Sequence, residues 1–193
     1  MIPLWLKISY TLFVAVLAPV YWTRYGPANF LWFSDIALLL TVPALWLENS
    51  WLASTMAVSV LLLELAWSFE FLARLLTGAN LTSLSGYMFD KRIPLYLRGL
   101  SLFHLVLPPL LFYLVWRLSY DGRALLTQTL LSWVVVPASY WASDAQQNVN
   151  WVYGFGAPPQ KWLPAPLHVA SLMLGLPLLV YLPTHLVLKK LFG

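Results

Sequence analysis

Residues 51–73 read WLASTMAVSVLLLELAWSFEFLA, an almost unbroken apolar run that contains Glu64 and Glu70. A helix needs about 20 mainly apolar residues to cross the hydrocarbon core of a bilayer. The run therefore predicts a membrane-spanning helix. An ionisable side chain inside a bilayer is costly and often marks a functional site, so Glu64 is a candidate for function.

Five further segments have the same apolar character, at residues 4–22, 30–48, 95–118, 124–142 and 166–188. The six segments use most of the 193 residues. They predict an all-α fold, a polytopic transmembrane bundle of six helices that forms a single domain over 1–193 with no soluble appendage. Val16-Leu17-Ala18 resembles a signal-peptide cleavage site, but Pro19 follows directly, so we expect this segment to remain a helix.

The composition excludes several classes of protein. Hydrophobic residues make up 61% of the chain and charged residues only 9%, whereas soluble domains carry about 25% charged residues. The net charge of +4 comes from scattered Lys and Arg, which do not form the clustered basic face that nucleic-acid binding needs. Cys is absent, and the three His lack metal-ligand spacing. We therefore expect no metal site, and no cofactor is implied.

Six spans put both ends of the chain on one side of the membrane, called side A, opposite to side B. The loops 74–94 and 143–165 then both lie on side B. Basic residues number five on side A and six on side B, so the positive-inside rule assigns no orientation. The small size and the lack of a targeting signal favour a multi-pass protein of a bacterial inner (cell) membrane. No pattern indicates an oligomeric state.

The polar residues within the spans gather toward side B. At 1.5 Å per residue, Glu64 and His104 each lie roughly 13 Å below side B on consecutive helices. Asp35 lies at a depth of about 7–8 Å on the helix before them. These depths predict a polar cavity that opens toward side B, with Glu64 and His104 at its floor and the two long loops around its mouth.

The same residue types suggest general-base activation of a hydroxyl. His104 is the candidate general base, with Asp35 or Glu64 as the carboxylate that orients it. Ser34 or Ser101 is the candidate nucleophile, because a neighbouring base can activate a hydroxyl. The candidate substrate-binding residues are Arg98, Asn148, Asn150 and Trp151.

Each of these residues also has a purely structural interpretation. Glu64 and His104 could form one hydrogen-bonded pair that locks two helices together. Asp35 could pair with Arg98 near the interface. Glu70 and Arg74, spaced i,i+4, predict an ion pair at a helix end. The loop 143–165 could be a packed interfacial turn.

Three features of the chain, in this order, resemble a family of integral membrane hydrolases, the androgen-induced and androgen-dependent proteins with their bacterial YwaF-like relatives. The first feature is the run from Asn29 to Leu38, which includes Phe33-Ser34-Asp35. The second is Phe103-His104 followed by Leu107-Pro108-Pro109, and the third is Trp151-Val152-Tyr153. The resemblance spans about residues 29–155 and implies a six-helix fold. It also implies cleavage of fatty-acid esters of hydroxy fatty acids by a Thr and a His. A more distant relative resembles a lipid acyltransferase.

The match to the site residues of this family is incomplete. His104 matches the family histidine, and Asp35 matches an Asp that follows the nucleophilic Thr. The position of that Thr, three residues before Asp35, is occupied by Trp32, which cannot act as a nucleophile. Ser34 points about 200° away from it around the helix, at 100° per residue. The resemblance thus implies a shared fold with altered or lost chemistry.

Three functions remain open. The first is an enzyme that hydrolyses or transfers a lipid acyl ester, with membrane lipid as its partner and a lipid ester as its substrate. The second is a small transporter or a binder of lipid or solute, in which intramembrane acids and His hold a head group or relay protons. The third is a non-catalytic membrane protein whose polar residues only fix the packing of helices.

Overall fold

The computed structural model describes residues 1–82, 84–156 and 159–193. Ser83, Ala157 and Pro158, which belong to the predicted loops 74–94 and 143–165, lie outside the described residues. The described chain is helical and contains no strand, which confirms the predicted all-α class.

In chain order the helices are α1 (Leu4–Tyr25), α2 (Phe33–Trp46), α3 (Ser50–Thr77), α4 (Leu95–Leu100), α5 (Phe103–Leu118), α6 (Ala124–Ala142), α7 (Ala165–Leu176) and α8 (Leu182–Phe192). The short turns of 3-10 helix are η1 (Pro27–Leu31), η2 (Gly86–Phe89) and η3 (Val149–Trp151), and a π-helical turn, η4 (Pro177–Tyr181), joins α7 to α8.

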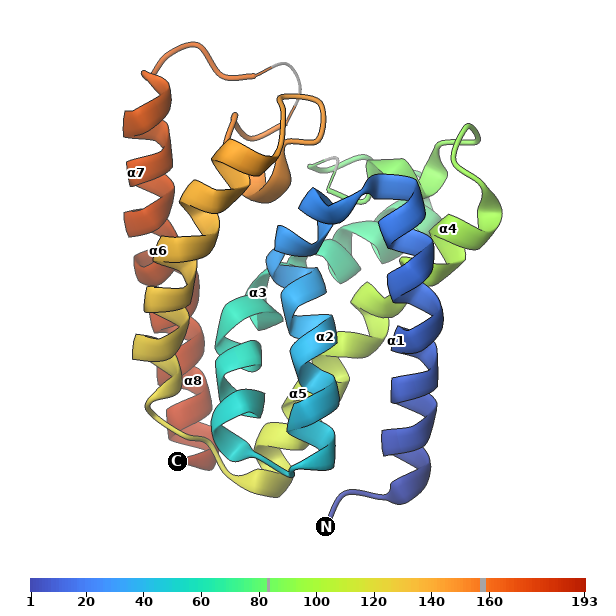
Figure 1. The fold of residues 1–193 in the computed structure, drawn as a ribbon, viewed down its shortest axis with the longest axis vertical. Coiled ribbons are helices and arrows are strands. Elements are labelled where there is room, and N and C mark those ends of the chain that lie inside the picture. Colours follow the sequence, from blue (N-terminus) through green and yellow to red (C-terminus); the bar gives the residue numbers. More distant parts are fainter. Residues whose placement is uncertain (83, 157–158) are drawn as a thin grey trace.

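Helix α3 lies at the centre of the bundle and contacts α2, α5, α6 and α8 (Figure 1). Its start is fixed by Asn49, whose side chain accepts a hydrogen bond from the backbone N–H of Leu52 at 2.9 Å, the usual role of an N-cap asparagine. Both termini lie at one end of the molecule, and the two long loops lie at the other (Figure 1). The sides A and B defined from the sequence are therefore the two ends of this bundle.

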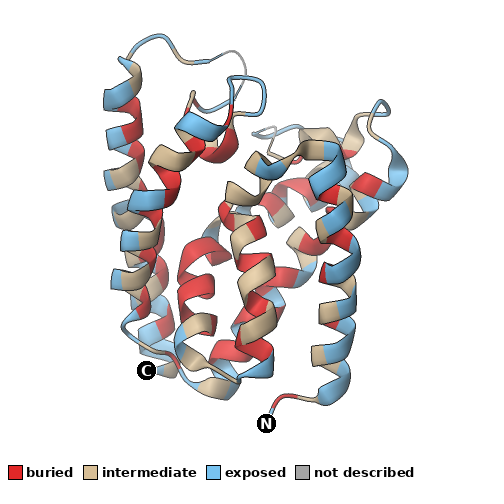
Figure 2. Ribbon diagram, in the orientation of Figure 1, coloured by how far each residue is buried: buried red, intermediate tan, exposed pale blue. Residues whose placement is uncertain are grey.

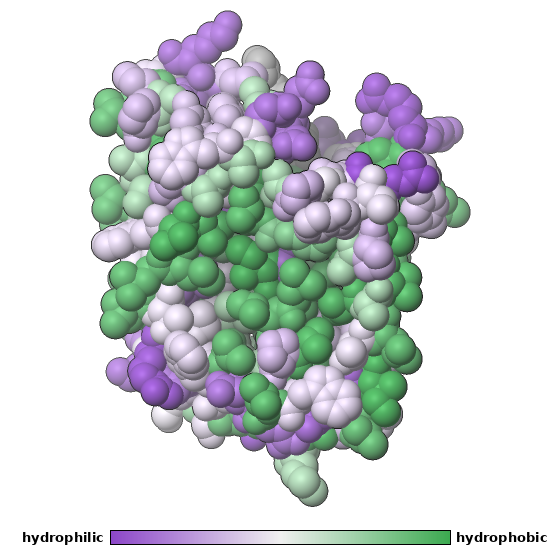
Figure 3. Space-filling view, in the orientation of Figure 1, coloured by the Kyte–Doolittle hydropathy of each residue, from purple (hydrophilic) through white to green (hydrophobic). Residues whose placement is uncertain are grey.

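The surface has the distribution expected of a membrane protein. Within the described part of the chain, four helical runs are long and apolar enough to cross a membrane, at Leu4–Tyr25, Ser50–Thr77, Leu95–Leu118 and Ala165–Phe192. A hydrophobic zone covers the middle of the visible face, and polar residues collect toward its two ends (Figure 3). Buried residues line the inward faces of the helices (Figure 2), while large apolar side chains such as Leu12 and Val134 are exposed. We therefore describe the chain as embedded in a membrane.

Three predicted spans differ from single regular helices, and the one over 166–188 is interrupted by the π-helical turn η4 between α7 and α8. The span predicted over 30–48 begins as helix only at Phe33, because Gly26 and Pro27 turn the chain into η1 first. The span predicted over 95–118 is broken at Ser101 and Leu102, where the backbone tightens into i→i−3 hydrogen bonds. Gly99 lies just before this break, and glycine weakens a helix by about 1 kcal/mol relative to alanine.

Prolines inside the spans leave backbone carbonyls free, and neighbouring helices satisfy two of them. Pro108 has no N–H to donate to the carbonyl of His104, and the Ser68 hydroxyl of α3 donates to that carbonyl instead, at 3.1 Å. Pro177 likewise frees the carbonyl of Met173, which accepts from the Trp133 indole of α6 at 2.9 Å. These contacts are the compensation expected for proline in membrane helices.

Candidate functional site

A short contact between Glu64 and His104 lies at the centre of the candidate site. Glu64 Oε2 on α3 is 2.6 Å from His104 Nδ1 on α5, and Glu64 is almost completely buried. A carboxylate in this position holds the imidazole proton on Nδ1 and leaves the lone pair on Nε2. The two side chains that the sequence predicts at the same depth thus contact each other.

The imidazole ring is also held by its aromatic neighbours. It stacks on Trp67, with ring centroids 4.6 Å apart, and on Phe103, with centroids 4.0 Å apart. No hydrogen bond to Nε2 occurs among the described residues, and His104 lines the cavity described below. One ring nitrogen is therefore oriented by Glu64, and the other is available to a bound molecule.

The cavity has a volume of about 1010 Å³, at the upper end of the range for ligand pockets. Its walls come from α1, α2, α3, α5 and α7 and from both side-B loops. Thr82, Leu84 and Tyr87 of the first loop line it, as do residues 145–148, Trp151 and Phe155 of the second. A cavity with the two loops around its mouth is thus present, but its lining is mainly apolar and not polar as predicted.

Asp35 lines the same cavity but is not the partner of His104. One of its oxygens, Oδ2, accepts a hydrogen bond from the Asn29 side chain at 3.0 Å. The other, Oδ1, is buried without a hydrogen-bond partner among the described residues. Asp35 does not pair with Arg98, contrary to the structural alternative considered above. Of the two candidate carboxylates, Glu64 makes the contact with the histidine.

The two candidate serines have different surroundings. Ser101 Oγ donates to the backbone carbonyl of Leu97 at 3.1 Å and lies 2.7 Å from the Tyr21 hydroxyl, so its hydrogen-bonding capacity is used within the protein. Ser34 lies at the start of α2, lines the cavity and makes no hydrogen bond to a described residue through its hydroxyl. Ser34 is the freer of the two hydroxyls.

Arg98 does not line the cavity, and its role as a substrate-binding residue stays a prediction. Its guanidinium Nη1 donates to the backbone carbonyl of Met88, at 3.2 Å, in η2. Arg98 instead supports the turn that brings Tyr87 to the cavity.

Glu70 and Arg74 also take other partners than the predicted ones. Glu70 Oε2 accepts from the Thr82 hydroxyl at 2.9 Å and from the backbone N–H of Ser85 at 3.0 Å. Arg74 donates to the Asn80 side chain. Glu70 therefore fastens the first side-B loop onto α3.

The amides of the second side-B loop stabilise the backbone. The Asn150 side chain donates to the Leu31 carbonyl at 2.7 Å and to Ser139 Oγ at 2.9 Å, and it accepts from the N–H of Phe33 at 3.2 Å. The Asn148 side chain bonds to the carbonyl of Gly154 and the N–H of Tyr153 within its own loop. Both residues border the cavity, but most of their polar atoms are committed to the fold.

Trp151 has an unusual backbone conformation, with φ at +59°, next to Asn150 at +54°. A bulky residue with positive φ is strained and needs the surrounding structure to hold it. Its carbonyl accepts from His168 Nε2 at 2.9 Å, and its ring packs edge-on against Trp32 with centroids 5.6 Å apart. Strain of this kind clusters at functional sites, and here it turns Trp151 toward the rim of the cavity.

The sequence did not single out Tyr21, Asn29, Tyr87 or Ser68, which contact the predicted site residues. Tyr21 and Asn29 bond to Ser101 and Asp35, and Ser68 bonds to the backbone of His104. The proline four residues after His104 was the available signal for Ser68. No comparable signal marks the others, because their contacts depend on how η1 and η2 fold over the helices.

No protein-family model, no curated protein and no solved structure matches this chain. The resemblance to the membrane hydrolase family therefore remains a prediction from the residues quoted above.

Proposed function

We propose that this membrane protein cleaves or transfers a lipid acyl ester, with His104 as general base and Glu64 as the carboxylate that orients it. The observation that carries the proposal is the 2.6 Å contact between Glu64 Oε2 and His104 Nδ1. It leaves Nε2 available in a cavity of about 1010 Å³. A buried carboxylate, an oriented imidazole and a cavity are the parts that general-base catalysis requires.

The proposed reaction proceeds through two proton transfers. Nε2 takes the proton of the attacking hydroxyl, whose oxygen bonds to the ester carbonyl carbon. The tetrahedral intermediate then releases the alcohol, which receives that proton from Nε2. When Ser34 is the attacking group, an acyl-serine forms, and water or an acceptor alcohol removes the acyl group by the same base. When water attacks directly, the same two proton transfers give the acid and the alcohol without an acyl-serine.

Ser34 is the proposed nucleophile because its hydroxyl is free in the cavity, whereas that of Ser101 is bonded to Tyr21 and Leu97. Labelling of the purified protein by a fluorophosphonate probe tests this assignment. Loss of the label in both Ser34→Ala and His104→Gln supports an activated serine. A label that persists in Ser34→Ala, or ester hydrolysis without any label, contradicts the assignment of Ser34.

The dyad is tested by ester hydrolysis in reconstituted vesicles. His104→Gln should lower kcat by about 10²–10⁴-fold, the usual contribution of a general base. The matched control is His185→Gln on α8, because His185 is bonded to Tyr120 and lies outside the cavity. Equal rates in His104→Gln and the wild type would refute the proposal.

One observation favours a second candidate function, the binding of a lipid without turnover. No side-chain hydroxyl of a described residue is hydrogen-bonded to His104 Nε2, and Trp32 occupies the position of the family nucleophile. In a binding protein, the dyad would hold a polar head group in the cavity. Lipid that copurifies with the wild type and is lost in His104→Gln, without hydrolysis in either protein, would support this second function.

A further inference from the structure

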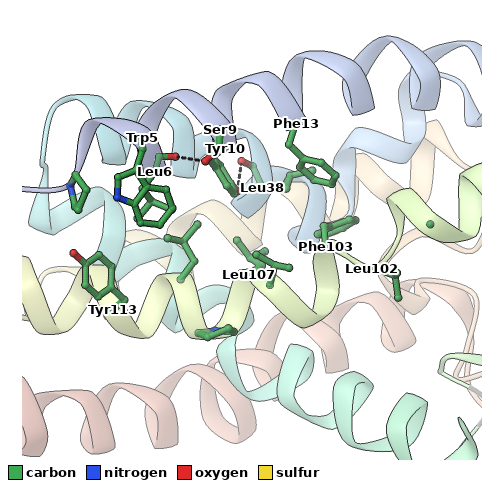
Figure 4. Close-up of a pocket in the computed structure, with 15 residues that line it drawn as sticks. Trp5, Leu6, Ser9, Tyr10, Phe13, Leu38, Leu102, Phe103, Leu107 and Tyr113 are labelled. Carbon is green, nitrogen blue, oxygen red and sulfur yellow. Dashed lines mark hydrogen bonds between the residues drawn. The ribbon is translucent and has the colours of Figure 1, made fainter.

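A second hollow, of about 570 Å³, lies between α1 and the α4–α5 segment (Figure 4). Trp5 and Phe13 of α1 face Phe103, Leu107 and Tyr113 of α5 across it (Figure 4). We call this hollow the α1–α5 groove. Val106, also in its lining, is 57% exposed at the surface, so the groove opens toward the surrounding hydrocarbon.

The groove has a mainly apolar lining, and two of the polar side chains in it are bonded within the protein. The Tyr10 hydroxyl donates to the backbone carbonyl of Leu38 at 2.9 Å, and the Ser9 hydroxyl donates to that of Leu6 at 3.3 Å (Figure 4). The remaining lining is mainly aliphatic and aromatic. Such a surface suits a hydrocarbon chain and offers nothing to a polar head group along its middle.

The groove and the cavity around His104 share one residue of their linings, Phe103. This residue precedes His104, and its ring stacks on the imidazole with centroids 4.0 Å apart. The aromatic ring of Phe103 therefore separates the proposed base from the hydrocarbon groove.

The length of the groove also fits a lipid tail. Along α5 it runs from Phe103 to Tyr113, about 15 Å at 1.5 Å per residue. This is about half of the roughly 30 Å hydrocarbon core of a bilayer, the depth that one leaflet of acyl chains occupies. The groove thus continues from the level of His104 toward side A.

We propose that the α1–α5 groove holds the acyl chain of the lipid ester whose carbonyl is placed at His104. This inference rests on the proposed function and adds a long unbranched acyl chain as the substrate class. The head group then occupies the cavity around His104 toward side B, and the chain passes Phe103 into the groove. Chain-length preference is set by this groove and not by the dyad.

Val106→Trp fills the groove, and Val16→Trp is its matched control. Val16 lies on α1, is 58% exposed and lines neither hollow. We expect Val106→Trp to lower the ratio of kcat/KM for p-nitrophenyl palmitate over p-nitrophenyl butyrate by about tenfold or more, the size of effect that lost apolar contacts give. We expect Val16→Trp to leave this ratio unchanged. An unchanged ratio in Val106→Trp overturns the inference.

Photo-crosslinking separates a failure of this inference from a failure of the proposed function. The probe is a phosphatidylcholine with a diazirine in its acyl chain, reconstituted with wild type, Val106→Trp and Val16→Trp. Crosslinks to α5 that Val106→Trp alone reduces support the groove as an acyl-chain site, even where no ester is hydrolysed. Crosslinks that neither variant changes overturn the inference, even where hydrolysis and its dependence on His104 are intact.

Discussion

The hydroxyl of Ser68 on α3 donates to the main-chain carbonyl of His104 on α5, at 3.1 Å. Pro108 frees this carbonyl, because it has no N–H to close the turn. The same two helices are joined through the Glu64 and His104 side chains. The histidine is therefore held to α3 by both its backbone and its ring, which fixes its position relative to the cavity.

Ser68→Ala should lower the free energy of unfolding by about 0.6–1.7 kcal/mol, the range found for hydrogen bonds between membrane helices. Reversible unfolding in mixed micelles measures it. Ser59→Ala on the same helix is the control, because the Ser59 hydroxyl is buried without a hydrogen-bond partner among the described residues. Its removal should be nearly neutral. Equal effects of the two variants would show that the Ser68 contact has no special role.

Asn150→Ala should loosen the second side-B loop, because it removes three hydrogen bonds and places alanine at a φ of +54°. We expect local opening to become easier by about 1–3 kcal/mol, the cost of buried groups left unpaired. Hydrogen exchange over residues 143–156 measures it. Gln147→Ala, an exposed neighbour, should leave exchange unchanged. If Asn150 acts only on a substrate, exchange in the free protein will not change.

Glu48 should make the anchoring of the N-terminus depend on pH. Hydrogen bonds from Lys7 and from the backbone N–H of Ile2 lower the pKa of Glu48 below its usual value of 4.5. A carboxyl with a lowered folded-state pKa stabilises the fold above its unfolded-state pKa, and the gain is lost as pH falls through the folded-state pKa. Stability measured from pH 7 downward should therefore decrease below about pH 4.5.

Glu48→Gln should remove this part of the acid sensitivity. The control is Gln146→Glu, in the exposed part of the second side-B loop, which adds a carboxyl without a Lys partner. This variant should have the same acid sensitivity as the wild type. A wild type and Glu48→Gln with the same pH profile would mean that the contact is not formed in the membrane.

The sequence predicted the vertical arrangement of this protein better than its lateral contacts. Apolar length and a constant rise per residue suffice to place Glu64 and His104 at one level, and the structure joins them directly. Arg98 lies outside the lining of the cavity, and the span that holds it is broken at Ser101 and Leu102. Hydropathy does not reveal this break, because the segments before and after it are equally apolar.

The loop residues show a second limit. Asn148 and Asn150 are polar residues beside a predicted cavity, and the sequence suggests binding. In the structure their amides bond to the backbone of a loop in which Asn148, Asn150 and Trp151 have positive φ. Asparagine tolerates that conformation well, but which peptide groups it meets depends on the packing of η1, α2 and α6. That packing is not encoded in any local pattern.

The central claim, that Glu64 and His104 act together as a catalytic base, is tested most directly by a double-mutant cycle on kcat. Glu64→Gln, His104→Gln and the double variant are compared with the wild type, and circular dichroism checks that each is folded. Residues that act as one unit are non-additive. We therefore predict that the double variant is no slower than His104→Gln alone, with both at least about 10²-fold below the wild type. Four folded proteins with the same kcat would contradict the claim.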